Sequence, residues 1–409
     1  MQDPVVDEPW IDCRTPKISL RSMFERDRAG GVQGWFGDRD VAYSVYARAA
    51  ILEACKLLDL GSGDEILAPA YNCGAEIDPL LKSGSAVTLY AVDRSTNINL
   101  EDLERRISPR TKAIYVIHYF GFCQPEIEAV QRLCRAQDLY LIEDCALGLF
   151  SESEAGRLGS FGDVSIFSFS KYFPVVGGGA LVVNNAALGA NIRFDRPPPR
   201  FLATKAFLRP FFRRIFGADR LRLITVTLKR ALGRSPAPEG GGDEAGGQVV
   251  MGQPDLPAHY YFDTALESAR MSAFARWPLR SFNVKDSIRK RRANYRVFLR
   301  ELSGLSSVRP LLPDLLDGVC PLAFPIIAAD RDGLCDALKG QPISSTTWWV
   351  GYHRALDCSE FTDTHFLKNN VLTLPVHQFL NERQIVFVAN QIKRFVSLEP
   401  SDARSAPGQ

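Results

Sequence analysis

The residues IEDCALGLFSESEAGRLGSFGDVSIFSFSKYFPVVGGGALVV, numbered 142 to 183, decide the fold of this chain. An apolar strand predicted over residues 139–142 ends in two carboxylates, Glu143 and Asp144. A second apolar strand, predicted over 164–169, is followed by Lys171 and then by the glycines 177–179. The pattern predicts neighbouring strands that bring a carboxylate and a lysine together at one edge of a sheet.

A carboxylate and a lysine placed in this way suit pyridoxal phosphate above other cofactors. The amine of Lys171 can form a Schiff base with the cofactor aldehyde. The carboxylate of Asp144 can keep the pyridine nitrogen protonated, so that the ring acts as an electron sink. Taken singly, the lysine would be a solvated strand end and the aspartate a helix cap. Their order and spacing, with Ser168 three residues before Lys171, favour the cofactor site.

Helices and strands alternate from Ser44 onward. Residues 44–60 show helical spacing with Ser44 as a plausible N-cap, and the strand EILAP follows at 65–69. Further helix and strand pairs extend to Asp144, which predicts a parallel sheet covered by helices on both faces, an α/β fold. Ligands of such sheets bind beyond the carboxyl ends of the strands. Asp144, His118 and the Tyr71-Asn72-Cys73 segment all fall at such ends.

The composition is that of an ordinary soluble enzyme. Of 409 residues 46% are hydrophobic and 23% charged, and the net charge of +2 gives no argument for a nucleic-acid partner. The nine cysteines include no CxxC pair or metal-type spacing, so we expect buried thiols and no metal site. No signal peptide or apolar run of roughly 18 residues is found, so we expect a cytoplasmic protein.

With these residues in place, the chain resembles the DegT/DnrJ/EryC1/StrS sugar aminotransferases, a family of pyridoxal-phosphate enzymes with the type I aminotransferase fold. The resemblance covers about residues 41–195 and 260–395. GSGDEILAP at 61–69 is similar to the family's GxGDEVIxP, and NNVLTLPVHQFLNERQI at 369–385 is similar to its C-terminal signature. The resemblance implies that Lys171 and Asp144 are the catalytic residues and that pyridoxal 5'-phosphate is the cofactor.

Further cofactor contacts follow from matching the family's motifs. The phosphate would be held by Ser168 and by Arg48 and Ala49 at a helix start, although Arg48 can equally be an exposed helix residue. Cys73 stands where the family usually has an aromatic residue over one ring face. Leu147 stands where it has Gln or His over the other. Ser268 replaces the Asn of a segment, here continuing Arg270-Met271-Ser272, that completes the neighbouring subunit's site; the alternative is a plain helix start.

Substrate contacts are predicted at five further positions, each of which can instead be structural: His118, Tyr71, Trp348, His353 and His377. We expect a large cofactor-binding domain over 1–270, a smaller C-terminal α/β domain over 271–400 and a disordered tail over 401–409.

An insertion with a glycine-rich linker interrupts the large domain at about 196–256. Its residues 200–234 carry ten Lys or Arg against one acidic residue, Asp219, with apolar residues at helical spacing. Such a segment can lie on an anionic membrane surface. The alternative is a helical pair packed on the large domain or at a subunit interface.

The resemblance implies an aminotransferase that takes an amino group from glutamate. The acceptor would be a nucleotide-linked keto-sugar, and the product an amino sugar for surface polysaccharide or a secondary metabolite. It also implies a homodimer with shared active sites. Two alternatives remain open: a pyridoxal-phosphate enzyme acting on a non-sugar carbonyl or amino acid, and a non-catalytic, membrane-associated relative of the fold.

Overall fold

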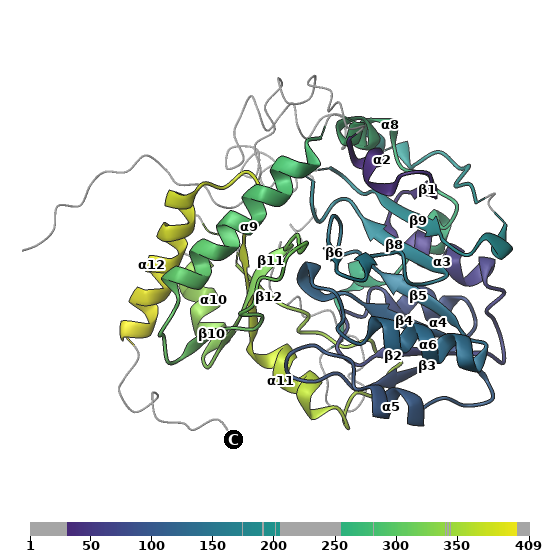
Figure 1. Ribbon diagram of the computed structural model, residues 1–409, viewed down its shortest axis with the longest axis horizontal. Helices are drawn as coiled ribbons and strands as arrows, with labels where there is room; N and C mark the ends of the chain where they lie inside the picture. The colour runs from purple at the N-terminus through teal and green to yellow at the C-terminus, as the bar shows by residue number, and fades with distance from the viewer. Residues whose placement is uncertain are drawn as a thin grey trace, which may run out of the picture.

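The computed structural model contains two main sheets, each with its own helices (Figure 1). It describes residues 31–173, 175–189, 192–200, 202–204, 255–280, 282–339, 341, 343 and 345–398. Most of the 196–256 insertion, including nearly all of the basic 200–234 segment, lies outside the described residues. So does the 401–409 tail. The expectations of membrane contact and of a disordered tail therefore stay predictions.

The larger sheet has seven strands in the order β1-β9-β8-β5-β4-β2-β3. Their bounds are β1 Asp40–Ser44, β2 Glu65–Pro69, β3 Ala86–Tyr90, β4 Thr111–Ile117, β5 Tyr140–Asp144, β8 Val164–Ser168 and β9 Gly179–Val183. Neighbours from β3 to β8 run parallel, whereas β9 runs antiparallel to both β8 and β1. The predicted α/β fold with a mainly parallel sheet is confirmed. A short hairpin, β6 (Glu152–Ser153) and β7 (Gly156–Arg157), connects β5 to β8.

Helices pack on the large sheet because its central strands are buried along almost their whole length. These helices are α2 Gly31–Phe36, α3 Ala47–Leu57, α4 Ile77–Lys82, α5 Leu100–Arg105 and α6 Ile127–Gln137. The predicted first helix starts later than expected, with Tyr46 as its N-cap. Ser44 belongs instead to β1, where it pairs with Gly179. Tertiary pairing of β1 thus overrides the capping preference of serine.

The second sheet is antiparallel, with the order β10-β11-β13-β12. Its strands are β10 Val308–Pro310, β11 Ala323–Ala328, β12 Thr346–Thr347 and β13 Val371–Pro375. Helices α9 (Val284–Glu301), α10 (Arg331–Lys339) and α12 (Glu382–Leu398) belong to this unit, whereas α8 (Ala273–Arg276) lies beside α2 (Figure 1). The predicted domain boundary near residue 270 stays a prediction.

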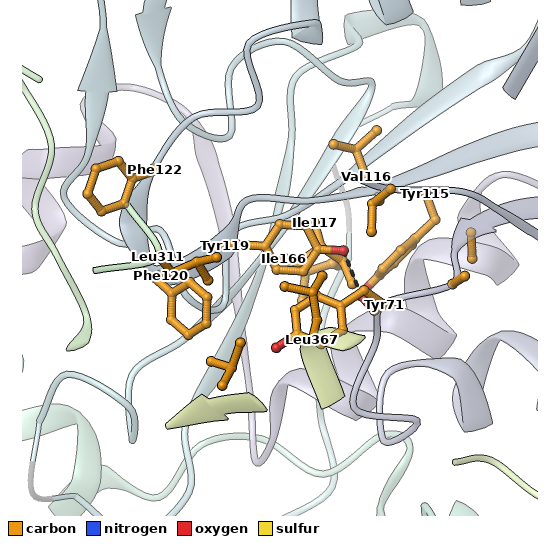
Figure 2. Close-up of a cluster of buried hydrophobic side chains, with 14 of the residues drawn as sticks. Tyr71, Tyr115, Val116, Ile117, Tyr119, Phe120, Phe122, Ile166, Leu311 and Leu367 are labelled. Carbon is orange, nitrogen blue, oxygen red and sulfur yellow. Dashed lines mark hydrogen bonds between the residues drawn. The ribbon is translucent and has the colours of Figure 1, made fainter. Parts of the chain in front are cut away.

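The two units meet at the carboxyl ends of β2 and β4. Aromatic side chains that follow these strands, Tyr71, Tyr119 and Phe120, pack with Leu367 of α11 (Thr362–Asn370) in one hydrophobic cluster (Figure 2). The Tyr119 hydroxyl donates a 2.6 Å hydrogen bond to the carbonyl of Tyr71. The strand ends that carry Asp144 and Cys73 therefore lie beside the C-terminal unit.

Candidate active site

Asp144 is the last residue of β5 and is only 5% exposed. Its Oδ2 accepts a 2.7 Å hydrogen bond from the Tyr115 hydroxyl, and its Oδ1 accepts a 2.8 Å bond from the Ala146 N–H. Burial raises the pKa of this carboxyl above its ordinary value, and the nearby positive charge of Lys171 acts in the opposite direction. Asp144 is thus a buried carboxyl that is held by two hydrogen bonds and lies close enough to Lys171 for the lysine charge to act on it.

Lys171 lies in the turn that follows β8. The turn begins with a 2.9 Å hydrogen bond from the Phe169 N–H to the carbonyl of Gly178. The Lys171 side chain is exposed, and it forms no hydrogen bond or ion pair with any of the described residues. Its charge acts on both Asp144 and Cys73. The amine is therefore available to a ligand beyond the end of β8, the strand beside β5.

One glycine of β9, Gly179, lies between the end of β8 and the start of α3. Gly179 pairs in register with Ser168, and a Cβ built on Gly179 would lie 2.4 Å from the backbone nitrogen of Ala47. The N-cap Tyr46 makes no side-chain cap, and its carbonyl accepts from the N–H groups of Ala49 and Ala50, so the N–H groups of Ala47 and Arg48 keep their capacity to bind an anion. Ser168 adds a nearby hydroxyl. Ala49 is fully buried and its N–H donates to the Tyr46 carbonyl at 3.1 Å, so its predicted phosphate contact stays a prediction.

Arg48, the other predicted phosphate contact, points to a different partner. Its Nη1 donates to the carbonyls of Tyr260, His259 and Tyr261 at 2.6, 3.1 and 3.3 Å. These residues belong to or follow η3 (Ala258–Tyr260). The guanidinium therefore ties the segment after the insertion to α3, and its role toward a phosphate stays a prediction.

Two predicted ring contacts lie on segments beside Lys171. Cys73 is partly buried, and its thiol donates to the carboxylate of Glu76, whose other oxygen accepts from the Cys73 N–H at 2.8 Å. Leu147 is buried, and its carbonyl accepts a 2.6 Å hydrogen bond from the hydroxyl of Tyr172, the residue after Lys171. The chain thus places a thiol and an apolar residue at the predicted positions.

These residues fit pyridoxal phosphate. Lys171 offers a free amine for the aldehyde, Asp144 a carboxyl for the ring nitrogen, and the start of α3 with Ser168 a set of donors for the phosphate. The fit rests on the buried Asp144 carboxyl and on the close packing of Gly179 against the helix start.

The Ser268–Ser272 segment runs along the outer edge of the large sheet. Ser44 forms a bridge with Arg270, and the Val45 N–H bonds the Ala269 carbonyl at 2.8 Å. Ser268 is half-buried, the Arg270 side chain is exposed, and Ser272 caps α8. The segment thus also starts a helix, and its exposed arginine is accessible to a partner.

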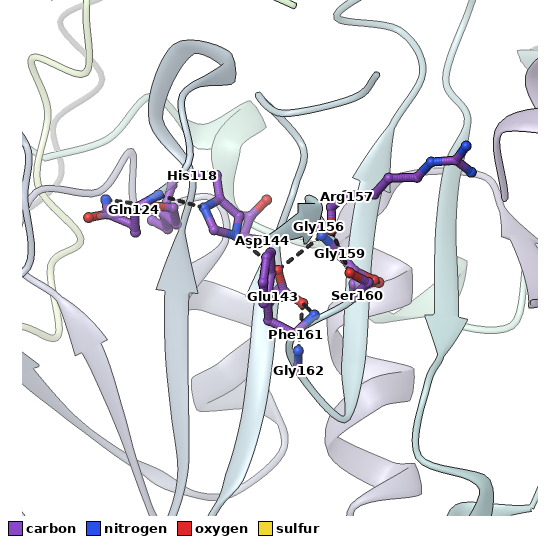
Figure 3. Close-up of polar contacts among 12 residues, drawn as sticks. His118, Gln124, Glu143, Asp144, Gly156, Arg157, Gly159, Ser160, Phe161 and Gly162 are labelled. Carbon is purple, nitrogen blue, oxygen red and sulfur yellow. Dashed lines mark hydrogen bonds and ion pairs between the residues drawn. The ribbon is translucent and has the colours of Figure 1, made fainter. Parts of the chain in front are cut away.

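His118 lies in a buried hydrogen-bond network behind the site (Figure 3). Its Nδ1 accepts from the Gln124 N–H at 3.1 Å, and its Nε2 donates to Glu143 at 2.9 Å. Glu143 also accepts from the N–H groups of Gly159, Phe161 and Gly162 at 3.0, 2.6 and 2.6 Å. This placement favours the structural role of His118, because its ring has no surface to offer a substrate.

The ligand atoms of His118, Glu143 and Cys145 lie within 4.8 Å of one another, as in a metal site. Four hydrogen bonds already saturate the Glu143 carboxylate. A cation would have to displace N–H groups fixed by the backbone, so the cluster is a structural network tying β5 to the loop before β8.

The remaining substrate candidates lie around the contact between the two units. Tyr71 is fully buried, with its ring centroid 5.2 Å from that of Trp349, and Trp348 is half-buried against Phe120. His353 is buried, and its Nε2 lies 3.3 Å from Asp78. Half-buried His377 packs beside Phe379. Of these, only the half-buried side chains keep a surface for a substrate.

Two residues that contact predicted site residues were not predicted from the sequence: Tyr115, which bonds Asp144, and Glu76, which bonds Cys73. Tyr115 carried a usable signal, because a tyrosine in a strand buried on both faces needs a hydrogen-bond acceptor. Glu76, at the N-cap position of α4, gave no such signal, since an acid at a helix start is ordinarily solvated.

The solved structures that this chain resembles share its architecture. The aminotransferase TlmJ of Streptoalloteichus hindustanus superposes with a TM-score of 0.65 at 18% identity, covering 95% of this chain and 98% of that one. PseC of Helicobacter pylori, an aminotransferase of pseudaminic acid biosynthesis, gives 0.62 at 18%, covering 94% and 99%. The chain has the type I aminotransferase fold.

Residues 38–199 match the model of the DegT/DnrJ/EryC1/StrS aminotransferase family. It is 32% identical to GDP-perosamine synthase of Vibrio cholerae over 135 residues, 32% of this chain and 36% of the relative. It is 34% identical to dTDP-3-amino-3,6-dideoxy-alpha-D-galactopyranose transaminase of Aneurinibacillus thermoaerophilus over 213 residues, 46% and 58% of the two chains. The matched region thus spans between about a third and three fifths of these relatives.

Proposed function

We propose that this protein is a pyridoxal-phosphate-dependent aminotransferase that moves an amino group from an amino acid, glutamate in the first instance, to the keto group of a nucleotide-linked sugar. The observation that carries the proposal is the placement of the buried Asp144 carboxyl and the exposed amine of Lys171 after adjoining strands, where the lysine charge acts on the carboxyl. The similarity to a GDP-perosamine synthase and to a dTDP-amino-sugar transaminase supports this class of acceptor.

Bound pyridoxal phosphate would supply an aldehyde that takes up the amino group and a ring that accepts the electrons of the donor's Cα–H bond. Lys171 Nζ would bind the aldehyde carbon and, once a donor amine has replaced it, would take the proton from the donor Cα as a general base. Asp144 would hold the proton on the ring nitrogen, with Tyr115 steadying its second oxygen. The start of α3 and Ser168 would bind and orient the phosphate.

We also propose a homodimer in which the exposed Arg270 on the outer edge of the large sheet reaches the neighbouring site. Sedimentation at working concentration is expected to give a dimer, and Arg270→Ala is expected to lower activity without changing that state. A monomer with full activity would contradict the proposal.

None of the described helices combines the length and apolar character needed to cross a bilayer. Cytoplasmic location stays a prediction.

The test begins with the absorbance of the purified protein beside Lys171→Ala. A visible band in the wild type that is lost in the variant and shifts on adding glutamate, with release of 2-oxoglutarate, is expected. A panel of nucleotide-linked keto-sugars and of non-sugar carbonyls then identifies the acceptor class. Turnover of non-sugar carbonyls alone would replace the sugar assignment. A wild type that stays colourless with added pyridoxal phosphate would contradict the enzymatic function.

A further inference from the structure

Lys368 of α11 is a lysine buried between the two units, with only 1% of its surface exposed. Its Nζ donates to three backbone carbonyls, those of Asn72, Trp349 and Gly351, at 2.6, 2.9 and 2.8 Å. An ammonium group has three N–H donors, so all of them are used. The ammonium also lies 4.6 Å from the centroid of the Tyr352 ring.

The charge of Lys368 has no carboxylate partner among the described residues. The titratable groups that face it are Cys358, Cys73 and Glu76, with Tyr352 as the ring partner. Burial lowers the pKa of the lysine to about 8, and Cys358, Cys73 and Glu76 oppose the shift. Burying an unpaired ammonium is costly, and an apolar side chain would fill the same volume without that cost. Its presence therefore needs a reason other than stability.

The carbonyls that Lys368 binds belong to the segments that shape the candidate site. Asn72 directly precedes Cys73, and its own side chain closes the turn by accepting from the Gly74 N–H at 3.0 Å. Trp349 has a φ of 54°, in the left-handed region that a bulky residue rarely adopts. Its ring lies 5.2 Å from Tyr71 and 5.7 Å from Tyr119, which follow β2 and β4.

We propose that Lys368 is a positioning residue of the candidate active site: its ammonium group holds the Cys73 turn and the Trp349 ring in one fixed arrangement across the contact between the two units. One positive charge with three donors joins segments from both sheets, which no neutral side chain of similar length could do. The proposal rests on the proposed function only for the identity of the site that is shaped.

The arrangement should depend on the charge of Lys368. A neutral amine has only two donors and cannot serve three carbonyls, so deprotonation releases one contact. The aromatic neighbours do not titrate in the same range, because burial raises the pKa values of Tyr71 and Tyr119 and raises that of Tyr352 to about 12. A change at the Trp349 ring near pH 8 would therefore report on Lys368.

The test compares Lys368→Met, which keeps the length but removes the donors, with Lys368→Arg, which keeps charge and donors. The matched control is Lys339→Met, a 56% exposed lysine on α10. In the cofactor-free protein at pH 7, the alkylation rate of Cys73 is measured by peptide mass spectrometry. We expect it to rise about tenfold or more in Lys368→Met and to stay near the wild-type value in Lys368→Arg and Lys339→Met.

The wild type is also followed by near-ultraviolet circular dichroism from pH 7 to pH 9. We expect a transition centred at about pH 8 that Lys368→Met lacks. If Lys368→Met does not fold, the transition in the wild type and the labelling of Lys368→Arg still test the proposal. Unchanged Cys73 labelling in a folded Lys368→Met, or no transition in the wild type, would overturn the proposal. Pyridoxal phosphate binding, measured in parallel, tests the proposed function separately, because neither readout above needs the cofactor.

Discussion

The hydroxyl of Tyr115 lies 2.7 Å from Oδ2 of Asp144, and both side chains are buried. The strands β4 and β5 pair so that Ile117 faces Asp144, and Tyr115, two residues earlier on the same face of β4, reaches along that face to the carboxylate. The hydrogen bond favours the ionised carboxylate and opposes the effect of burial on its pKa. Tyr115 thus helps Asp144 stay charged where charge is costly.

Replacing Tyr115 with Phe should raise the pKa of Asp144 further and lower kcat/KM by roughly tenfold to a hundredfold, since a hydrogen bond to a charged group contributes about 1.5–3 kcal/mol. The pH profile of kcat/KM should move its acidic limb to higher pH. Tyr90→Phe is the matched control, because among the described residues the buried Tyr90 hydroxyl bonds only the carbonyl of Tyr115, at 3.0 Å. An acidic limb that stays in place in Tyr115→Phe would contradict the role of Tyr115 in keeping Asp144 ionised.

Asp144→Asn should stabilise the cofactor-free protein at pH 7 by roughly 1 kcal/mol, the order of a typical point substitution, while abolishing transamination. The carboxyl has a raised pKa when folded, so the folded state binds the proton more tightly than the unfolded chain. Stability therefore falls as pH rises from the ordinary value of 3.8 through the raised pKa of the folded state. Urea unfolding should show the gain at pH 7 and its loss near pH 4. An Asn variant less stable than wild type at pH 7 would refute this account.

Gly179→Ala should weaken phosphate binding. Its Cβ would lie 2.4 Å from the Ala47 nitrogen and 2.6 Å from its Cα, so the start of α3 must move. We expect the ratio of affinities for pyridoxal phosphate over pyridoxal, which lacks the phosphate, to fall about tenfold, with about 1–3 kcal/mol lost in stability. Gly61→Ala is the control, because its nearest neighbour would be the Ser83 carbonyl oxygen at 4.0 Å. An unchanged ratio would place the phosphate elsewhere.

Glu143→Gln should lower the free energy of unfolding by about 3–5 kcal/mol, because it removes the charge and turns an N–H group toward the backbone donors of the 159–162 loop. Urea denaturation measures the loss, and Glu152→Gln, whose side chain is 52% exposed, should cost almost nothing.

His118→Asn should likewise destabilise the protein but leave the KM for substrate unchanged in the folded fraction. A KM raised about tenfold with full stability would restore His118 as a substrate contact.

Much of the large sheet could be read from the sequence, because each strand is an apolar run bounded by turns and each helix shows its own period. The same patterns placed Asp144 and Lys171 at strand ends. They did not show that Arg48 binds the carbonyls of residues 259–261, because those residues lie more than 200 positions along the chain. Nor did they show that His118 faces Glu143, because a residue that follows a strand can turn toward either face of the sheet.

The sequence by itself determined the parallel sheet, the order of the reactive residues and the resemblance that carries the cofactor, since hydrophobic period and local spacing are properties of neighbouring residues. Only the tertiary structure decided which side chains are buried and which partners they meet. The hydroxyl of Tyr115 on Asp144 and the ammonium of Lys368 on the Cys73 turn join strands and helices distant along the chain. Such pairs depend on register and on the packing of two sheets, which local sequence does not encode.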